Sequence, residues 1–293
     1  MPNPFFVAFE IMLMGLFALC LRHAARLGPS AVWQLVAGVL FGLLLEWATL
    51  RQLHAYRYGR FLLMLGQVPL MVGVGWGVII YSVRLFSDAT SLPEWARPML
   101  DGLLALTIDL AMDAVAIRLG MWDWGRGPQD QYFGVPYANF WAWFWVVFTF
   151  SVGLRGFARP ATWAGRWLAP MGAILLGLVN LIAMNTLMTM DMPEASYMPT
   201  IALMLGVALA LVFWLRPRFS LCRSDPLVFW VPFAFHAYFL VAGLLSGVIL
   251  RPPVLLLMSV TMSVVALYLH RGSLWAWRNR LPTMPDTGSA AGG

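Results

Sequence analysis

Long apolar stretches separated by short polar segments run along almost the whole chain. A helix needs about 20 mostly apolar residues to cross a bilayer. Eight stretches approach or exceed that length: residues 5–21, 31–50, 61–83, 99–117, 137–154, 168–190, 197–215 and 227–250. A shorter ninth stretch, residues 254–269, follows a turn with the sequence Arg251-Pro252-Pro253. The pattern therefore predicts an all-α, polytopic integral membrane protein, a single bundle of eight or nine transmembrane helices.

No internal repeat and no long linker divides these stretches, so residues 1–270 are predicted to form one transmembrane domain. The first stretch contains Glu10 and no basic segment precedes it, which favours a retained span over a cleaved signal peptide. Residues 271–293 end in a run of small residues and are predicted to be a disordered tail.

Composition excludes the other broad classes of protein. Hydrophobic residues make up 61% of the chain and charged residues 11%, with a mean hydropathy of +0.76, whereas a soluble domain is about a quarter charged. Such a chain lacks the polar surface of a water-soluble globule and is too apolar for a disordered protein. The two cysteines, Cys20 and Cys222, do not have the spacing of a zinc cluster or a disulfide framework.

The charge pattern indicates membrane topology rather than nucleic-acid binding. All 19 lysine-or-arginine positions hold arginine, and the absence of lysine excludes Schiff-base chemistry and a P-loop. In a nine-span arrangement, 13 arginines fall on one side of the membrane and six on the other. The positive-inside rule then predicts a multi-pass protein of the cell membrane with its N-terminus outside and its C-terminus in the cytoplasm.

Four acidic residues inside predicted spans stand out, because charges there are costly and indicate function by default. Glu10 has no local partner, and a structural hydrogen bond to another helix explains it as well as a catalytic role does. Glu46 lies near the end of the second span. Asp109 and Asp113, spaced i, i+4, share one face of the fourth span, and Asp101 extends that face toward the opposite surface.

The aspartate pair has a direct chemical consequence. Two carboxyl groups one helical turn apart in a low-dielectric environment do not both ionise, so one is predicted to keep its proton beside a carboxylate. That arrangement suits general acid catalysis or proton transport. The alternative is that an arginine such as Arg57 or Arg118 neutralises the pair, which then has only a structural role.

The alternation of the spans brings several polar groups to one membrane face. Glu46 and Asp113 lie near the ends of the second and fourth spans, and Asn139 lies near the start of the fifth. The polar loops at residues 51–60 and 118–136 belong to the same face. The sequence therefore predicts a site at one leaflet.

Aromatic residues crowd the same region. The connection between the fourth and fifth spans contains Trp122-Asp123-Trp124 and a run of rings from Tyr132 to Phe144. Aromatic residues at a bilayer interface are usually anchors, but their electron-rich faces also stabilise cations. Rings beside membrane-embedded acids fit chemistry on a polyene or isoprenoid that passes through a carbocation.

Several of these motifs together resemble a known family. They are Glu46, the stretch 54–59, the run Val68-Pro69-Leu70 with Trp76, the acids Asp109 and Asp113, Trp122-Asp123-Trp124, Tyr132-Phe133-Gly134-Val135-Pro136, and Asn139-Phe140. This set is similar to the polytopic carotenoid-biosynthesis family, which includes γ-carotene hydratases and bisanhydrobacterioruberin hydratases. The resemblance covers residues 38–153, and its most specific element is Tyr-Phe-Gly-Val-Pro followed shortly by Asn-Phe.

The resemblance implies a hydratase that adds water to the terminal (ψ-end) double bond of a linear or monocyclic carotenoid, without metal, flavin or nucleotide. Protonation of such an alkene requires a desolvated carboxylic acid. The hypothesis gives this role to Asp113 or Asp109 and makes Glu46 the group that orients water or takes its proton. Asn139, Tyr132 and His54 are expected to orient water or the acid. The residues expected to line the substrate pocket are Trp122, Trp124, Trp143, Phe140, Tyr56 and Trp76.

The implied partners are a carotenoid or other isoprenoid substrate, membrane lipid and other carotenoid-pathway enzymes, with no nucleic acid. Two other functions stay open. A membrane prenyltransferase also carries aspartates four apart, but it needs two acidic clusters to hold Mg²⁺ and diphosphate, and this chain has one. A proton-coupled transporter of an apolar substrate also uses intramembrane acids, although inverted repeats are expected in that class.

Overall fold

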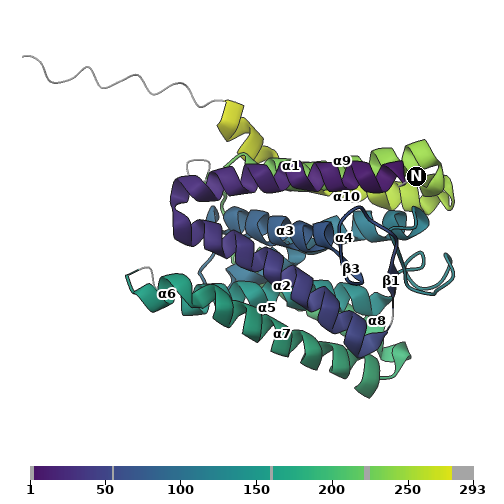
Figure 1. Cartoon of the computed structure of the whole chain (residues 1–293), viewed down its shortest axis with the longest axis horizontal. Coiled ribbons are helices and arrows are strands. Elements are labelled where there is room, and N and C mark those ends of the chain that lie inside the picture. Colours follow the sequence, from purple (N-terminus) through teal and green to yellow (C-terminus); the bar gives the residue numbers. More distant parts are fainter. Residues whose placement is uncertain (1–2, 55, 159–160, 221–224, 279–293) are drawn as a thin grey trace, which may run out of the picture.

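The computed structural model describes residues 3–54, 56–158, 161–220 and 225–278. Within them, nine helices have 18 residues or more and run back and forth through one bundle (Figure 1). They are α1 Pro4–Leu27, α2 Pro29–Leu53, α3 Leu70–Asp88, α4 Arg97–Arg118, α5 Tyr137–Phe157, α7 Ala169–Thr186, α8 Tyr197–Trp214, α9 Leu227–Ser246 and α10 Pro253–Arg278. The short helix α6, Trp163–Trp167, precedes α7, and a π-helical turn, Leu187–Asp191, extends it.

Eight of the described helices are long and apolar enough to cross a membrane. The remaining long helix, α4, carries two arginines and three aspartates and is too polar to count among them. It contacts α3, α5, α8, α9 and α10 and lies in the middle of the bundle (Figure 1). The surrounding helices therefore shield the aspartates of α4 from lipid. The chain is a multi-pass integral membrane protein, and the predicted all-α bundle is confirmed.

Two element boundaries differ from the prediction. The third long helix begins at Leu70 rather than at residue 61, because Gly66 (φ 64°) turns the chain and a hairpin of β2 Met64–Leu65 and β3 Val68–Pro69 precedes the helix. The last helix, α10, continues to Arg278, so residues 271–278 are helical rather than part of a tail. The rest of the predicted tail, residues 279–293, and Cys222 lie outside the described residues.

Glycines face each other where α2 packs on α3. Gly38 and Gly42 on α2, and Gly73 and Gly77 on α3, each repeat at a spacing of four. A Cβ atom at Gly38 would lie 3.2 Å from the Gly77 Cα, and one at Gly42 would lie 2.5 Å from the Cβ of Trp76. Small residues allow helix backbones to approach closely, which favours helix association in lipid. This contact fixes Trp76 against the last turns of α2.

Gly42→Ala is expected to destabilise the protein, because the new methyl group cannot fit without moving Trp76 or separating the two helices. Overpacking of this kind costs about 1–3 kcal/mol. The measurement is the apparent midpoint of thermal unfolding in detergent, followed by tryptophan fluorescence. Gly15→Ala on α1 is the matched control, since nothing lies within 4 Å of its new methyl group. An unchanged midpoint for Gly42→Ala would contradict the close α2–α3 contact.

A short antiparallel ladder joins two connections at one end of the bundle. Strand β1, Arg57–Tyr58, follows α2 and pairs with β4, Trp122–Asp123, which follows α4. Tyr58 lies opposite Trp122. The ladder holds the α2–α3 and α4–α5 connections together over the ends of the helices that carry Glu46 and Asp113.

Candidate functional site

The site lies at the end of the bundle where α2 and α4 end and where α3 and α5 begin, beside the strands labelled β1 and β3 in Figure 1. Glu46 comes from the last turns of α2, Asp113 from the last turns of α4, and Asn139 from the first turn of α5. Because successive helices run in opposite directions, these three positions meet at one end.

Glu46 is only 6% exposed and accepts three hydrogen bonds. The indole Nε1 of Trp76 donates to Oε1 at 2.7 Å, the Tyr58 hydroxyl donates to Oε2 at 2.7 Å, and the Tyr56 hydroxyl donates to the same Oε2. Burial, together with the neighbouring Glu46, raises the pKa of Tyr56 and of Tyr58, so both hydroxyls stay protonated and act as donors. These contacts hold the Glu46 carboxyl group in one orientation.

Asp109 and Asp113 lie one turn apart on α4 and are 0% and 2% exposed. Their carboxyl groups lie within hydrogen-bonding reach of each other. The amide of Asn139 bridges them, with Nδ2 at 2.7 Å from Oδ2 of Asp113 and 3.2 Å from Oδ2 of Asp109. A hydrogen bond between two carboxyl groups needs a proton on one of them. The geometry therefore fits a pair that holds a single proton.

A cavity of about 410 Å³ lies between these groups, and we call it the acid cavity. Eight of the twelve side chains predicted for the site line it: Glu46, Asp113, Asn139, Tyr56, Trp76, Trp122, Trp124 and Trp143. The structure thus brings two buried acids from different helices to one cavity that is otherwise rich in aromatic rings.

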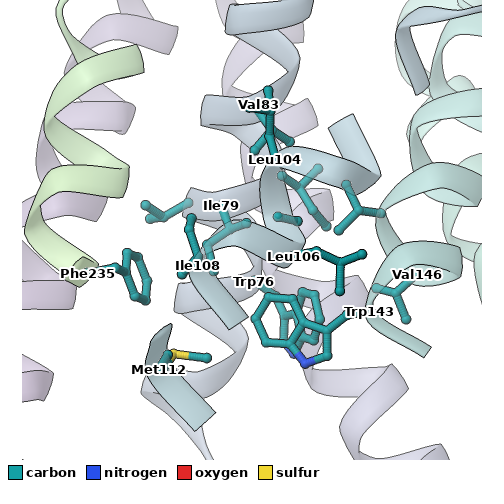
Figure 2. Close-up of a cluster of buried hydrophobic side chains, with 14 of the residues drawn as sticks. Trp76, Ile79, Val83, Leu104, Leu106, Ile108, Met112, Trp143, Val146 and Phe235 are labelled. Carbon is teal, nitrogen blue, oxygen red and sulfur yellow. The ribbon is translucent and has the colours of Figure 1, made fainter. Parts of the chain in front are cut away.

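Two indole rings form one wall of the acid cavity. The ring centroids of Trp76 and Trp143 are 4.2 Å apart, with 39° between the ring planes. Figure 2 shows the two rings packed against each other, with Phe235 of α9 reaching toward the same interior. Since the Trp76 N–H group is bonded to Glu46, this aromatic wall stands directly beside a carboxyl group.

The other four predicted residues are outside the lining of the acid cavity. Asp109 contacts it only through Asp113 and Asn139. The Tyr132 hydroxyl donates to the Leu110 carbonyl at 2.8 Å, and the ring packs edge-on against Phe140. His54 is exposed, ends α2 in a left-handed conformation (φ 49°) and does not line the acid cavity.

The arginines considered as neutralising partners of the aspartates are engaged elsewhere. Arg57 pairs with Asp123 at the surface, at 3.6 Å. Arg118 donates to the backbone carbonyls of Ala114, Phe133 and Pro128. Within the described part of the chain, no ion pair involves Asp109 or Asp113. The structure places neither arginine against the pair.

The remaining buried acids serve other parts of the fold. Glu10 accepts hydrogen bonds from the backbone N–H groups of Leu62 and Leu63, at 3.1 and 3.4 Å, which matches its structural interpretation. Asp101 pairs with Arg155 at 2.6 Å at the opposite end of α4. Among the described residues, no group of three or more His, Cys, Asp or Glu side chains is arranged to hold a metal ion.

Sequence reasoning missed Tyr58 and the contribution of α7. Tyr58 lies in the polar stretch already singled out, two residues after Tyr56, and this proximity was the available signal. On the far wall of the cavity, Asn185 of α7 donates to Gln52 of α2 at 3.3 Å. A single amide in an apolar span often marks an interhelical hydrogen bond, but nothing in the sequence identifies its partner.

A comparison with protein families matches residues 4–213 to the family described as carotenoid biosynthesis protein. The match covers more than half of the chain and includes all residues of the site from α2, α3, α4 and α5. The chain belongs to the carotenoid biosynthesis protein family. Comparisons with curated proteins and with solved structures found no match.

Membership confirms the family resemblance and supports a role in carotenoid biosynthesis, with an enzyme-type activity and a carotenoid or other isoprenoid substrate. Helix α9 and helix α10 lie beyond the matched residues. Even so, Phe235 of α9 lines the acid cavity, so this part of the chain contributes to the site that the family region builds.

Proposed function

We propose that this protein is a hydratase that adds water to the ψ-end double bond of a linear or monocyclic carotenoid and forms a tertiary alcohol. The observation that carries the proposal is the buried Asp109–Asp113 pair, which reaches an aromatic cavity through Asp113. An acid beside a wall of indole rings is the arrangement that proton transfer to an alkene requires. Because Asp113 lines the cavity and Asp109 does not, Asp113 is the proton donor.

In the first step, the π electrons of the terminal alkene take the proton from the Asp113 carboxyl group. A C–H bond forms at the less substituted carbon, the O–H bond of the acid breaks, and a tertiary cation remains on the other carbon. Asp113 becomes a carboxylate, and Asn139 donates a hydrogen bond to it. Exclusion of bulk water strengthens the electrostatic interactions that assist this transfer.

The cation is stabilised by the faces of the aromatic rings around it. Trp76 and Trp143 present a continuous indole wall, and Trp122 and Trp124 line other parts of the cavity. A cation over an indole face gains about 2 kcal/mol when the contact is desolvated. The same rings keep the reactive intermediate away from nucleophiles other than the positioned water.

Water then adds to the cation, and its excess proton is taken by a carboxylate. Glu46 stands on the cavity wall with both oxygens already accepting hydrogen bonds. A carboxylate has about four acceptor positions, so one is left to orient the water and receive its proton. Transfer of this proton from Glu46 back to Asp113, which lines the same cavity, restores the starting state, so the net change is alkene plus water to alcohol, with no change in redox state.

Co-expression tests the proposal directly. The protein is produced in a host that makes lycopene or γ-carotene, and the pigments are analysed by chromatography and mass spectrometry. The expected product is the substrate plus one water per hydrated end, with a tertiary hydroxyl group, and the rate in isolated membranes is expected to be insensitive to a chelator. Unchanged pigment despite protein in the membrane, or a prenylated product, would contradict the proposal.

Trp143→Leu is expected to slow water addition roughly tenfold, because the substitution removes a ring face worth about 1–2 kcal/mol to the cation. Trp143→Phe keeps a ring face and is expected to retain more of the rate. Trp47→Leu is the matched control, since Trp47 is 55% exposed and lies outside the acid cavity. The rates are measured in membranes with equal amounts of protein. Equal losses for Trp143→Leu and Trp47→Leu would argue against the cation-stabilising role.

A further inference from the structure

A second, smaller cavity lies between α9 and α10, in the part of the chain beyond the family match. Its volume is about 150 Å³, and apolar side chains such as Phe229, Pro232 and Leu267 form most of its wall. It is separate from the acid cavity: of two adjacent residues on α9, Phe235 lines the acid cavity and His236 lines the second one. We call this second space the histidine cavity.

Three polar side chains line the histidine cavity, and one of them, Ser263, already donates its hydroxyl to the Ser259 carbonyl at 2.7 Å, which leaves two imidazole rings. His236 of α9 and His270 of α10 both line it and are only 4% and 3% exposed. Within the described residues, neither ring nitrogen of His236 has a hydrogen-bond partner, and Nδ1 of His270 has none either. Unpaired buried polar groups are costly, so two of them beside one cavity point to a ligand that pairs with them.

The hydrogen bonds of His270 indicate which polar group the ligand carries. A ring N–H group of His270 donates to the backbone carbonyl of Val228. Because Nδ1 has no partner, the Val228 carbonyl accepts from Nε2 and leaves Nδ1 as a bare acceptor in a neutral ring. Burial beside apolar side chains favours the uncharged form of His236, which has one donor and one acceptor. A single hydroxyl group pairs with both rings: its O–H donates to Nδ1 of His270 and its oxygen accepts from the N–H group of His236, so two of the three unpaired nitrogens gain a partner.

The size and position of the histidine cavity specify the rest of the ligand. A cavity of about 150 Å³ accepts a molecule about as large as benzene, which corresponds to the end group of an isoprenoid rather than to a whole carotenoid. Phe233 and Leu267 line the cavity and are 38% and 44% exposed on the apolar outer face of the bundle. The cavity is therefore accessible from the lipid, where the remainder of a long chain would lie.

We propose that the histidine cavity binds the tertiary alcohol end of a hydrated isoprenoid, with the hydroxyl group bridging His236 and His270. The need for an uncharged, hydroxyl-bearing apolar ligand follows from the cavity alone. The choice of a tertiary isoprenoid alcohol rests on the proposed function, since that is the product the acid cavity would form. The histidine cavity then holds the hydroxylated end group away from Asp113, the acid that protonates the alkene.

The test compares two probes that differ by one water: the tertiary terpene alcohol dihydromyrcenol and the corresponding hydrocarbon dihydromyrcene. Binding to the purified protein in detergent is measured by equilibrium dialysis with gas chromatography. The wild-type protein is expected to bind the alcohol about tenfold more tightly than the hydrocarbon, the value of one to two hydrogen bonds. His236→Leu leaves only the hydrogen bond to His270 and is expected to reduce that preference to about threefold, without loss of thermal stability.

Two further variants separate the possible outcomes. Ser259→Ala is the matched control, because Ser259 is also a buried, unpaired polar residue of α10 but lies outside the cavity lining, and it is expected to keep the tenfold preference. Asp113→Asn is expected to keep it as well, so the result does not depend on whether the protein is a hydratase. Equal binding of the two probes to the wild type, or an unchanged preference in His236→Leu, would overturn the proposal. If the preference for the alcohol were lost in Asp113→Asn but kept in His236→Leu, the alcohol would bind in the acid cavity instead.

Discussion

Asp113→Asn is expected to abolish water addition while the protein still folds and enters the membrane. Asparagine has nearly the same size as aspartate and can hydrogen-bond to Asp109 and Asn139 in its place. It cannot, however, release a proton to an alkene. General acids contribute about 10²–10⁴-fold to rate, so the hydrated carotenoid is expected to fall at least about 100-fold in a co-expression assay normalised to protein amount.

Two further variants make the Asp113 result specific. Asp109→Asn removes the other member of the carboxyl pair and is expected to cause a similar loss, although Asp109 does not line the acid cavity. Glu10→Gln is the matched control: it also replaces a buried acid in a membrane helix, but its amide oxygen can still accept from the backbone of Leu62. Equal activity of Asp113→Asn and Glu10→Gln would remove Asp113 from the mechanism.

Glu46 is the second position where a substitution has a large expected effect. Glu46→Leu leaves the buried donors of Tyr56 and Trp76 without their acceptor. Leaving a buried donor unpaired costs about 1–3 kcal/mol, so a clear fall in the apparent midpoint of thermal unfolding is expected, together with loss of the hydrated product.

Glu46→Gln separates the chemical role of Glu46 from its structural one. The glutamine oxygen can still accept from Trp76, and the tyrosine hydroxyls can rotate to accept from the new amide. The midpoint is therefore expected to stay near the wild-type value, whereas hydration still falls at least about 100-fold because an amide does not take a proton from water. Wild-type hydration by Glu46→Gln would show that Glu46 only supports the fold.

Most of the fold follows from hydropathy, because a bilayer leaves helices as the main way to satisfy the backbone of an apolar chain. The prediction was wrong at residues 61–69, where apolar residues form a hairpin. Apolar character indicates burial but not backbone conformation, which Gly66 and Pro69 determine here. The glycine spacing at Gly38, Gly42, Gly73 and Gly77 was present in the sequence and predicts the α2–α3 contact.

The site was predictable to the extent that it depends on topology. Helix alternation alone places Glu46, Asp113 and Asn139 at one end of the bundle, and the structure brings them to one cavity. The orientation of individual side chains was not predictable. His54 looked chemically suitable, but it ends α2 with a left-handed backbone and is exposed. Tyr132 lies close to the aspartates, yet its hydroxyl is bonded to a backbone carbonyl.

Infrared difference spectroscopy of the carboxyl groups tests the central claim most directly. If the Asp109–Asp113 pair stores one proton, the wild-type protein has the C=O stretch of a protonated carboxyl group, and that band shifts in D₂O. The band is expected to be missing from both Asp113→Asn and Asp109→Asn and to persist in Glu10→Gln. A band of equal intensity in the wild type and both aspartate variants would mean that the pair holds no proton, which would contradict the account.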